Sequence, residues 1–274
     1  MTQLNDPAQL STFRLRRRTP GSFVLVPYPQ LGRSLRCQGQ LEAATALILS
    51  ASTLVTNIQE QPCSIWYAWR ETARRVEFQL CSEPRRRRRQ DGVRLSYIVP
   101  DFLVTCRDGS RWLLEVKPST KLSRPDVRRK LAVATEFAHQ QGWTFHVVTE
   151  QHLQRGYLLD NLQRLTRYRQ VGVDAEIIAL LVDAVATGPR TIDQLIDSAV
   201  SSTAQRTSLY HLLATGRLSC DLQTAPLNSQ TLIFDGGIHP WDPFASLWGP
   251  SGCSTDGRTA SSDNPAVASS PQST

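Results

Sequence analysis

The chain has 274 residues, of which 40% are hydrophobic, so it is long enough to bury one sizeable core and a smaller second one. Its formal net charge of +7 favours a polyanionic partner, although charge alone does not identify one. The six cysteines form no Cys-x-x-Cys pair, which argues against a zinc knuckle or a disulfide framework and favours a reducing compartment. Because the sequence shows neither a membrane-length apolar run nor the apolar core of a signal peptide, we expect a cytoplasmic protein.

The lysines are few and lie close together. Of the 31 cationic side chains only three are lysines, at positions 117, 121 and 130, and the other 28 are arginines. In a chain that otherwise uses arginine, three lysines within one short segment call for a specific explanation.

The N-terminal part predicts a basic arm, a helix and two extended segments. Residues 1–21 end in RLRRRTPG and are predicted to form the arm, which is either solvated surface or a phosphate contact. The composition of residues 39–52 predicts a helix with one apolar side, and Glu42 lies at the border of that side. After Pro62, the segments SIWYAW and RRVEFQL read as strands.

Five consecutive arginines follow these segments, namely Arg85, Arg86, Arg87, Arg88 and Arg89. Because like charges repel and Pro84 and Asp91-Gly92 flank the run, we expect an exposed loop between two strands. The loop is either a solvated tip or a contact to a phosphate backbone, and we favour the contact.

The next segments complete a mixed α/β core. Residues 97–119, YIVPDFLVTCRDGSRWLLEVKPS, predict two strands joined by an Asp-Gly turn. A helix is expected over 124–142, a strand over 143–150 and more helix over 151–170.

A second unit begins near Asp174. Helices are expected at 174–187, 191–199 and 203–216, followed by a two-stranded ribbon, which together fit a winged-helix module. Near the start of the third helix, Gln205, Arg206 and Ser208 are the candidate groove contacts, although winged helices also bind proteins. Residues 235–274 are rich in Gly, Ser, Thr and Pro and are predicted to be a disordered tail.

The predicted hairpin carries three charged groups. Glu115 and Lys117 lie two residues apart and therefore share one face of their strand, and pairing across the turn brings Asp101 towards Glu115. Two converging carboxylates repel unless a cation or a proton lies between them, and Mg²⁺ is a suitable ion because it favours carboxylates, waters and phosphate oxygens. This combination suits phosphodiester hydrolysis.

A cross-strand charge ladder on an exposed edge is the structural alternative. We favour the metal site, because YIVPDFLV and WLLEVK are apolar on both faces and therefore resemble central strands.

Pro-Asp, thirteen intervening residues and Glu-x-Lys resemble the PD-(D/E)xK signature of restriction-endonuclease-like nucleases. The chain is similar to TnsA endonuclease subunits of heteromeric, Tn7-like transposases. The similarity lies in five segments and their order, namely QLEAATALIL, LVTNIQEQP, YIVPDFLV, LLEVKPS and LLDNLQRLTRY. The resemblance implies a restriction-endonuclease-like nuclease domain over 22–172 and a winged-helix-like domain over 173–234. It leaves the serine-rich tail and the long arginine segment unexplained.

The resemblance also implies roles for individual residues. Glu42, in QLEAA, occupies the place of the family's helical acid, so Glu42, Asp101 and Glu115 would hold one or two Mg²⁺ ions, with Mn²⁺ able to substitute. Lys117 would be the catalytic lysine. Some members have Gln where this chain has Glu115, which makes the site here more acidic. Further candidate DNA contacts are Lys121, Arg85, Arg86, Arg87, Arg88 and Arg89.

The function implied by the resemblance is cleavage at the 5′ ends of a transposon in a bacterial cell. The implied partners are transposon-end DNA, a DDE-family (TnsB-like) transposase subunit that cuts the 3′ ends, and an AAA+ ATPase (TnsC-like) regulator. Two alternatives stay open. One is a stand-alone nuclease of the same fold that acts in restriction or repair, and the other is a catalytically silent DNA-binding scaffold.

Overall fold

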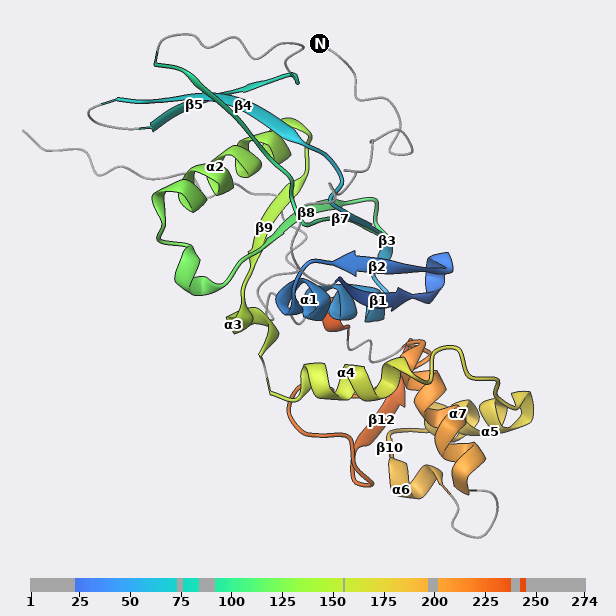
Figure 1. Cartoon of the computed structure of the whole chain (residues 1–274). Helices are drawn as coiled ribbons and strands as arrows, with labels where there is room; N and C mark the ends of the chain where they lie inside the picture. The colour runs from blue at the N-terminus through green and yellow to red at the C-terminus, as the bar shows by residue number, and fades with distance from the viewer. Residues whose placement is uncertain are drawn as a thin grey trace, which may run out of the picture.

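A computed structural model describes residues 23–72, 76–83, 92–154, 156–196, 202–237 and 242–244. The predicted N-terminal arm over 1–21 lies outside these residues, and so does the predicted arginine loop of Arg85, Arg86, Arg87, Arg88 and Arg89. Figure 1 shows a β-rich part with its helices, followed by a smaller, mainly helical part that also contains a short sheet.

A four-stranded mixed sheet forms the centre of the larger part, in the order β3-β7-β8-β9. Its strands are β3 (Val55–Glu60), β7 (Phe102–Cys106), β8 (Arg111–Val116) and β9 (Thr144–Val148). The first three are antiparallel and β9 runs parallel to β8. Gly109 takes a φ of +83° in the turn between β7 and β8, a conformation that glycine adopts readily. The predicted hairpin is confirmed, and both of its strands lie inside the sheet.

One face of this sheet is covered by helix α1 (Gln40–Ala51) and by a hairpin of β1 (Val24–Tyr28) and β2 (Arg33–Cys37), which the short helix η2 (Pro29–Leu31) connects. Leu47 and Ile48 share a core with Val104 and Leu114 of the sheet. The helix is confirmed, but the expectation of one apolar side is wrong for its second half. Residues 45–50 are all buried, because the hairpin and α4 also pack against α1.

The other face of the sheet is covered by α2 (Pro125–Gln140), which lies between it and a second sheet in the order β5-β4-β6. The second sheet consists of β4 (Ile65–Glu71), β5 (Val76–Cys81) and β6 (Arg94–Ile98). Val133 and Ala134 of α2 share a core with Tyr67 of one sheet and Leu113 of the other. Helix α2 therefore joins the two sheets.

The segment YIVPDFLV is not one strand, contrary to expectation. Ile98 ends β6 in the second sheet, and Phe102 begins β7 in the central sheet. Pro100 lies between them and has no backbone N–H to donate to a strand ladder. Asp101 therefore lies at the point where the chain passes from one sheet to the other.

After β9 the chain forms α3 (Glu150–Leu153) and α4 (Leu158–Thr166), and then the smaller unit. That unit contains α5 (Ala175–Ala186), β10 (Arg190–Thr191), α6 (Ile192–Leu195), α7 (Ser202–Ala214), β11 (Leu218–Ser219) and β12 (Leu232–Asp235). A capping box begins α6, because the Thr191 N–H donates to the Gln194 side chain at 2.9 Å and the Gln194 N–H donates to the Thr191 hydroxyl at 3.2 Å. Sequence reasoning missed β10, which completes an antiparallel sheet in the order β10-β12-β11.

No helix in the described ranges is long and apolar enough to cross a membrane.

Helix α4 attaches the smaller unit to the larger one. The amide of Asn161 donates to the carbonyls of Leu222 and Ala225, both at 2.8 Å, and its oxygen accepts from the N–H of Leu227 at 3.0 Å. A single hydrophobic core runs from β1 to β12. The parts of the chain on either side of the predicted domain boundary at 172–173 are therefore packed against each other.

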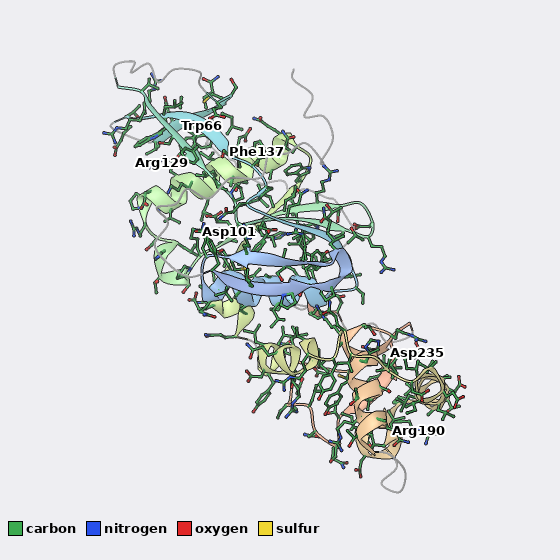
Figure 2. The ribbon with its side chains drawn as sticks, turned by 45° about the vertical axis from the view of Figure 1, so that its right-hand side comes forward. Trp66, Asp101, Arg129, Phe137, Arg190 and Asp235 are labelled. Atoms are coloured by element: carbon green, nitrogen blue, oxygen red, sulfur yellow. The ribbon has the colours of Figure 1, made fainter. Side chains whose placement is uncertain are left out.

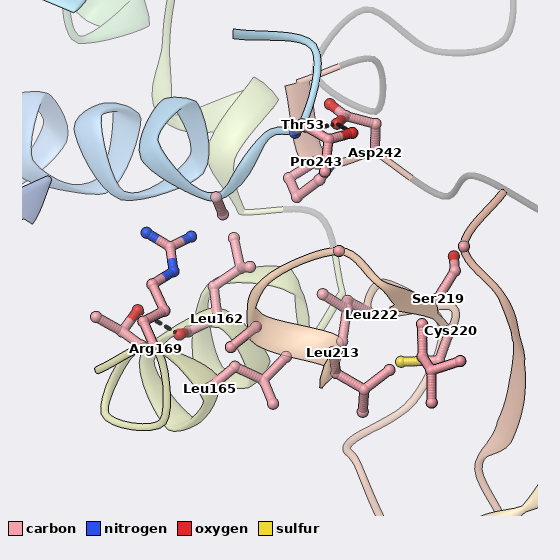
Figure 3. Close-up of a pocket in the computed structure, with 16 residues that line it drawn as sticks. Thr53, Leu162, Leu165, Arg169, Leu213, Ser219, Cys220, Leu222, Asp242 and Pro243 are labelled. Carbon is pink, nitrogen blue, oxygen red and sulfur yellow. Dashed lines mark hydrogen bonds between the residues drawn. The ribbon is translucent and has the colours of Figure 1, made fainter. Parts of the chain in front are cut away.

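Of the tail over 235–274 that was predicted to be disordered, only residues 235–237 and 242–244 are described. The prediction is wrong there, because Asp235 ends β12 and residues 242–244 return to the larger part. Asp242 is 7% exposed, and its carboxylate accepts from the Ser52 hydroxyl and the Thr53 N–H, each at 2.7 Å. Phe244 is buried with its ring centroid 5.1 Å from that of Trp112. Figure 3 shows Asp242 beside Thr53 at one end of a pocket that Arg169 also lines. We call residues 242–244 the C-terminal clip.

Candidate active site

The charged residues of the hairpin gather where Asp101 enters the central sheet. The backbone of Asp101 is held from both sides: its N–H donates to the carbonyl of Leu114 at 3.1 Å, and its carbonyl accepts from the N–H of Gln61 at 2.9 Å. Figure 2 places Asp101 in the middle of the larger part, between α2 and the β1–β2 hairpin. The strand ladder thus fixes the position of this aspartate.

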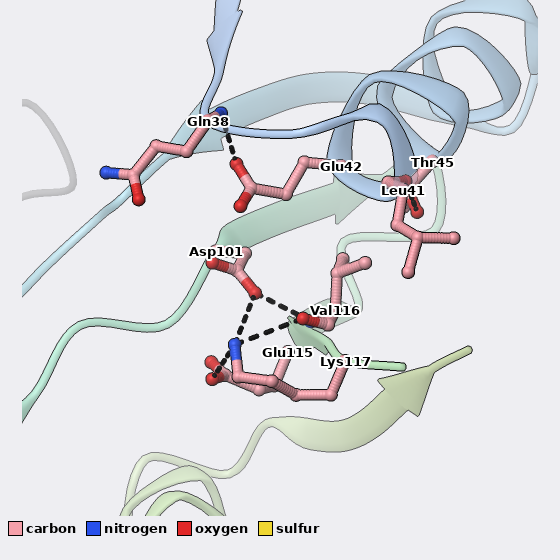
Figure 4. A network of polar contacts seen from close by, with 8 residues as sticks. All are labelled: Gln38, Leu41, Glu42, Thr45, Asp101, Glu115, Val116 and Lys117. Atoms are coloured by element: carbon pink, nitrogen blue, oxygen red, sulfur yellow. Dashed lines mark hydrogen bonds and ion pairs between the residues drawn. The ribbon is translucent and has the colours of Figure 1, made fainter. Parts of the chain in front are cut away.

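One lysine joins the two carboxylates of the hairpin (Figure 4). Lys117 Nζ lies 2.7 Å from Glu115 Oε1 and 3.5 Å from Asp101 Oδ2. Asp101 Oδ2 also accepts from the backbone N–H of Val116 at 2.7 Å, which orients the carboxylate. The predicted convergence of Asp101, Glu115 and Lys117 is confirmed as geometry.

The alternative of an exposed charge ladder is wrong for these residues. β7 and β8 are the two inner strands of the sheet, and the side chains of Asp101 and Glu115 are only 11% and 13% exposed. Burying two carboxylates with one ammonium costs free energy that a surface ladder would not. The arrangement therefore calls for a functional explanation.

Glu42 lies next to this group but does not join it. It comes from the first turn of α1, and its Oε2 accepts from the backbone N–H of Gln38 at 2.7 Å. Burial raises the pKa of Glu42, and so does the negative charge of Asp101. Figure 4 shows Glu42 on the side of Asp101 away from Lys117. The metal-binding role of Glu42 stays a prediction.

Burial raises the pKa of both carboxyls of the hairpin, and Lys117 offsets it only in part. Burial raises the pKa of Asp101 against the opposing charge of Lys117. Burial and then the charge of Asp101 raise the pKa of Glu115 to about 7. Burial lowers the pKa of Lys117, but Asp101 and Glu115 outweigh burial, so its pKa is raised and the ammonium stays charged. A further positive charge would lower the pKa values of both carboxyls.

Sequence reasoning missed two residues beside the acids. Glu60 ends β3 and is held by Arg33, whose Nη1 lies 2.7 and 2.9 Å from the two carboxylate oxygens. The Cys37 thiol is buried, and burial followed by the charges of Glu42, Glu60 and Asp101 raises its pKa to about 12. That thiol therefore stays protonated and is no nucleophile. The only sequence signal for Glu60 is its place just before Gln61-Pro62, where β3 ends.

The chemistry of Asp101 and Glu115 fits a hard divalent cation. Glu115 Oε2 is buried and has no hydrogen-bond partner, which leaves an acceptor oxygen for a cation. Mg²⁺ is commonly bound by one or two carboxylates together with waters and phosphate oxygens. Among the described residues, however, no group of three or more His, Cys, Asp or Glu side chains is arranged to hold a metal ion. The residues that fit a divalent cation are therefore Asp101 and Glu115, and the described residues do not form a three-carboxylate site that includes Glu42.

The predicted DNA contacts on the described part of the chain differ in their accessibility. Lys121 lies on the short helix η3 (Ser119–Lys121) and is exposed, as is Arg206 on α7, whereas Gln205 is half-buried. Ser208 is only 2% exposed, so its prediction as a groove contact is wrong. It lies beside Leu209 on the side of α7 that packs into the core.

The remaining predicted DNA contacts belong to the arginine run. They lie outside the described residues, so their contact with DNA stays a prediction for Arg85, Arg86, Arg87, Arg88 and Arg89 alike.

One stretch of the chain matches a known protein family. Residues 52–150 match the family model described as TnsA-like endonuclease N terminal. The matched range contains Asp101, Glu115 and Lys117, whereas Glu42 and the smaller unit lie outside it. A search of curated proteins found no match.

Proposed function

Because residues 52–150 match the TnsA-like endonuclease N-terminal family, we propose that the chain is the metal-dependent DNA endonuclease subunit of a heteromeric transposase. Its reaction would be the hydrolysis of phosphodiesters at the 5′ ends of the transposon. The observation that carries the proposal is the ion-paired group of Asp101, Glu115 and Lys117, which lies inside the matched range.

Each residue of the group has a distinct task in this proposal. Asp101, held by the N–H of Val116, and Glu115, with its unpartnered Oε2, would hold Mg²⁺. When bound, the ion would lower the pKa of a water and offset negative charge on the phosphate. Lys117 would stabilise the charge that develops on the phosphate oxygens, because its ammonium is already aimed at the space between the carboxylates. Glu42 is proposed to assist as a further acid beside Asp101.

In the hydrolysis, a water oxygen forms a bond to phosphorus while the bond to the leaving strand oxygen breaks. The proton lost by the water passes to solvent, and the leaving oxygen takes up a proton from solvent to become a hydroxyl. Lys117 keeps its proton throughout, because the two acids raise its pKa. Its role is therefore electrostatic and not that of a general base.

The smaller unit supports a second part of the proposal. Its order of helix, strand, two helices and two strands, with β12 between β10 and β11, supports the prediction of a winged helix. Arg206 is exposed near the start of α7, where such a fold meets DNA. We propose that this unit contacts either transposon-end DNA or a protein of the same complex.

The proposed partners follow from the family. A DDE-family transposase subunit would cut the 3′ ends, and an AAA+ ATPase would regulate the complex. The chain by itself would then cut poorly, since its action is tied to the partner. A stand-alone nuclease of the same fold would need no partner.

The test is strand cleavage of a plasmid that carries the element's ends, in Mg²⁺, with and without the DDE-family protein encoded next to this chain. We expect 5′-end cuts that need both Mg²⁺ and the partner. Equal cutting without the partner supports a stand-alone nuclease, and no cutting with the partner and Mg²⁺ leaves the DNA-binding scaffold as the better account.

A further inference from the structure

Helix α2 begins close to the proposed active site because of its place in the fold. β8 and β9 are parallel neighbours, so the chain must return along the sheet between them, and α2 makes this return (Figure 1). β8 ends at Val116, and α2 starts at Pro125 after the short helix η3. The first turns of α2 therefore lie at the end of β8 that carries Glu115 and Lys117.

The same face of the sheet carries α2 and the two charged residues. Leu113 of β8 packs against Val133 and Ala134 of α2. Side chains two residues apart on a strand point to the same face, so Glu115 points to the α2 side, as Leu113 does. The sheet-facing side of the first turns of α2 therefore points toward the acids.

Lys130 occupies that side of α2. The buried residues Val127 and Ala134 lie three positions before it and four after it, which is the spacing of one helix face. The positive charge of Lys130 acts on the Glu115 carboxylate, as this placement at the start of α2 leads one to expect. Its side chain is nevertheless exposed. A flexible cation thus lies at the rim of the acidic group.

Within the described ranges, Lys130 forms no hydrogen bond or ion pair. Its charge also acts on Asp126, one turn earlier on α2, but Asp126 is already paired with Arg124 at 3.2 Å. It is also one of only three lysines in a chain with 28 arginines, and Lys117 is another. A lysine kept only for solubility would not need a place on the sheet-facing side of the helix.

We propose that Lys130 binds a DNA phosphate next to the phosphate that is cleaved. A lysine ammonium is a mobile point charge that suits a phosphate whose position shifts during a reaction. This inference rests on the proposed function and adds a substrate contact to it. Lys117 would act on the reacting phosphate, and Lys130 would hold its neighbour on the α2 side.

The first experiment compares Lys130→Gln and Lys130→Arg with Arg128→Gln as the matched control. Arg128 is exposed on the same helix but two residues away, hence on a different side. Cleavage is measured on the plasmid substrate with the partner, and binding is measured on a labelled DNA duplex over a range of salt. Lys130→Gln should cut about tenfold more slowly, the loss expected for one charge-assisted hydrogen bond, and its salt slope should fall by about 1. Lys130→Arg should retain most of the activity, and Arg128→Gln should retain the cleavage rate.

The second experiment locates the phosphate. Single methylphosphonates, which lack the negative charge, are placed one at a time along the cleaved strand. At the contacted position the substitution should slow the wild type and add nothing to the defect of Lys130→Gln. A structural role for Lys130 would instead give the same additional loss at every position.

The outcomes separate the two claims. If the wild type cuts and Lys130→Gln matches it in cleavage and in salt slope, the Lys130 inference is overturned while the proposed function stands. If the wild type neither cuts nor binds DNA, both fail. If it binds without cutting, the salt slope of Lys130→Gln still decides whether the lysine contacts a phosphate.

Discussion

Lys117 Nζ lies 2.7 Å from Glu115 Oε1, two residues earlier on the chain, and the same ammonium reaches Asp101 at 3.5 Å. The lysine is thus a counter-charge that both acids share. Replacing Lys117 by Ala should lower cleavage about 100-fold or more, because it removes the cation next to the reacting phosphate and raises the pKa of both acids further. A plasmid-cleavage assay together with a circular-dichroism melt measures both effects.

The matched control for Lys117→Ala is Arg107→Ala. Arg107 is cationic like Lys117 but is exposed, and it lies at the end of β7 opposite to Asp101. Its loss should leave the cleavage rate within about twofold, as for an ordinary surface substitution. Wild-type cleavage in a folded Lys117→Ala protein contradicts the role assigned to the lysine.

Glu115→Gln should make the protein more stable while it loses activity. The folded-state pKa of Glu115 is raised from 4.5 to about 7, so its contribution to stability is complete below about pH 4.5 and is lost as pH rises through 7. Gln does not ionise, and in a buffer without divalent ions the variant should be more stable than wild type at pH 8, on the order of 3 kcal/mol. Urea unfolding at pH 8 and pH 4 measures the effect, and the difference should vanish at pH 4. If Glu115→Gln is less stable than the wild type at pH 8, burial does not disfavour the ionised form of Glu115 as proposed.

The C-terminal clip should stabilise the docking of the two parts. The Asp242 carboxylate accepts hydrogen bonds from Ser52, Thr53, Leu54 and Phe244. In Asp242→Asn one acceptor oxygen becomes a donor that faces these N–H and O–H groups, so we expect a loss of about 2 kcal/mol in the free energy of unfolding. Asp235→Asn is the matched control, because Asp235 is less buried and accepts from the N–H of Gly237. Equal stability of the two variants would show that the clip contributes nothing.

The arginine run is predicted to contribute to DNA binding and to its dependence on salt concentration. Replacing all five residues from Arg85 to Arg89 by Gln should weaken DNA binding and flatten its salt dependence, because each phosphate contact contributes about 0.9 to the slope. Fluorescence anisotropy over a series of salt concentrations measures the slope. An unchanged slope would mean that the run is solvated surface.

Local patterns predicted the hairpin and its charged group well. A strand period of two residues and an Asp-Gly turn suffice to bring Glu115 towards Asp101, because the turn sets the register of the two strands. The ion pairs with Lys117 follow from that register. These are short-range relationships, which sequence spacing encodes directly.

Contacts between residues far apart in the chain could not be predicted from the sequence. Pro100 lies within an apolar run that reads as one strand, and the run alone does not reveal that the chain changes sheets there. The burial of Ser208 depends on how α7 packs, and α7 has apolar residues on more than one side. The contact of Asp242 with Thr53 joins residues 189 positions apart, and no local pattern predicts such a pairing. Tertiary packing decided each of these cases.

The most direct test of the central claim compares the wild type with Asp101→Asn in Mg²⁺-dependent cleavage of transposon ends in the presence of the DDE-family partner. Asn keeps the size of the side chain but lacks the negative charge, so the variant should fold and bind the partner as the wild type does. The account predicts 5′-end cuts by the wild type, which disappear in EDTA, and no detectable cuts by Asp101→Asn. Equal cutting by the two proteins would contradict the assignment of this site.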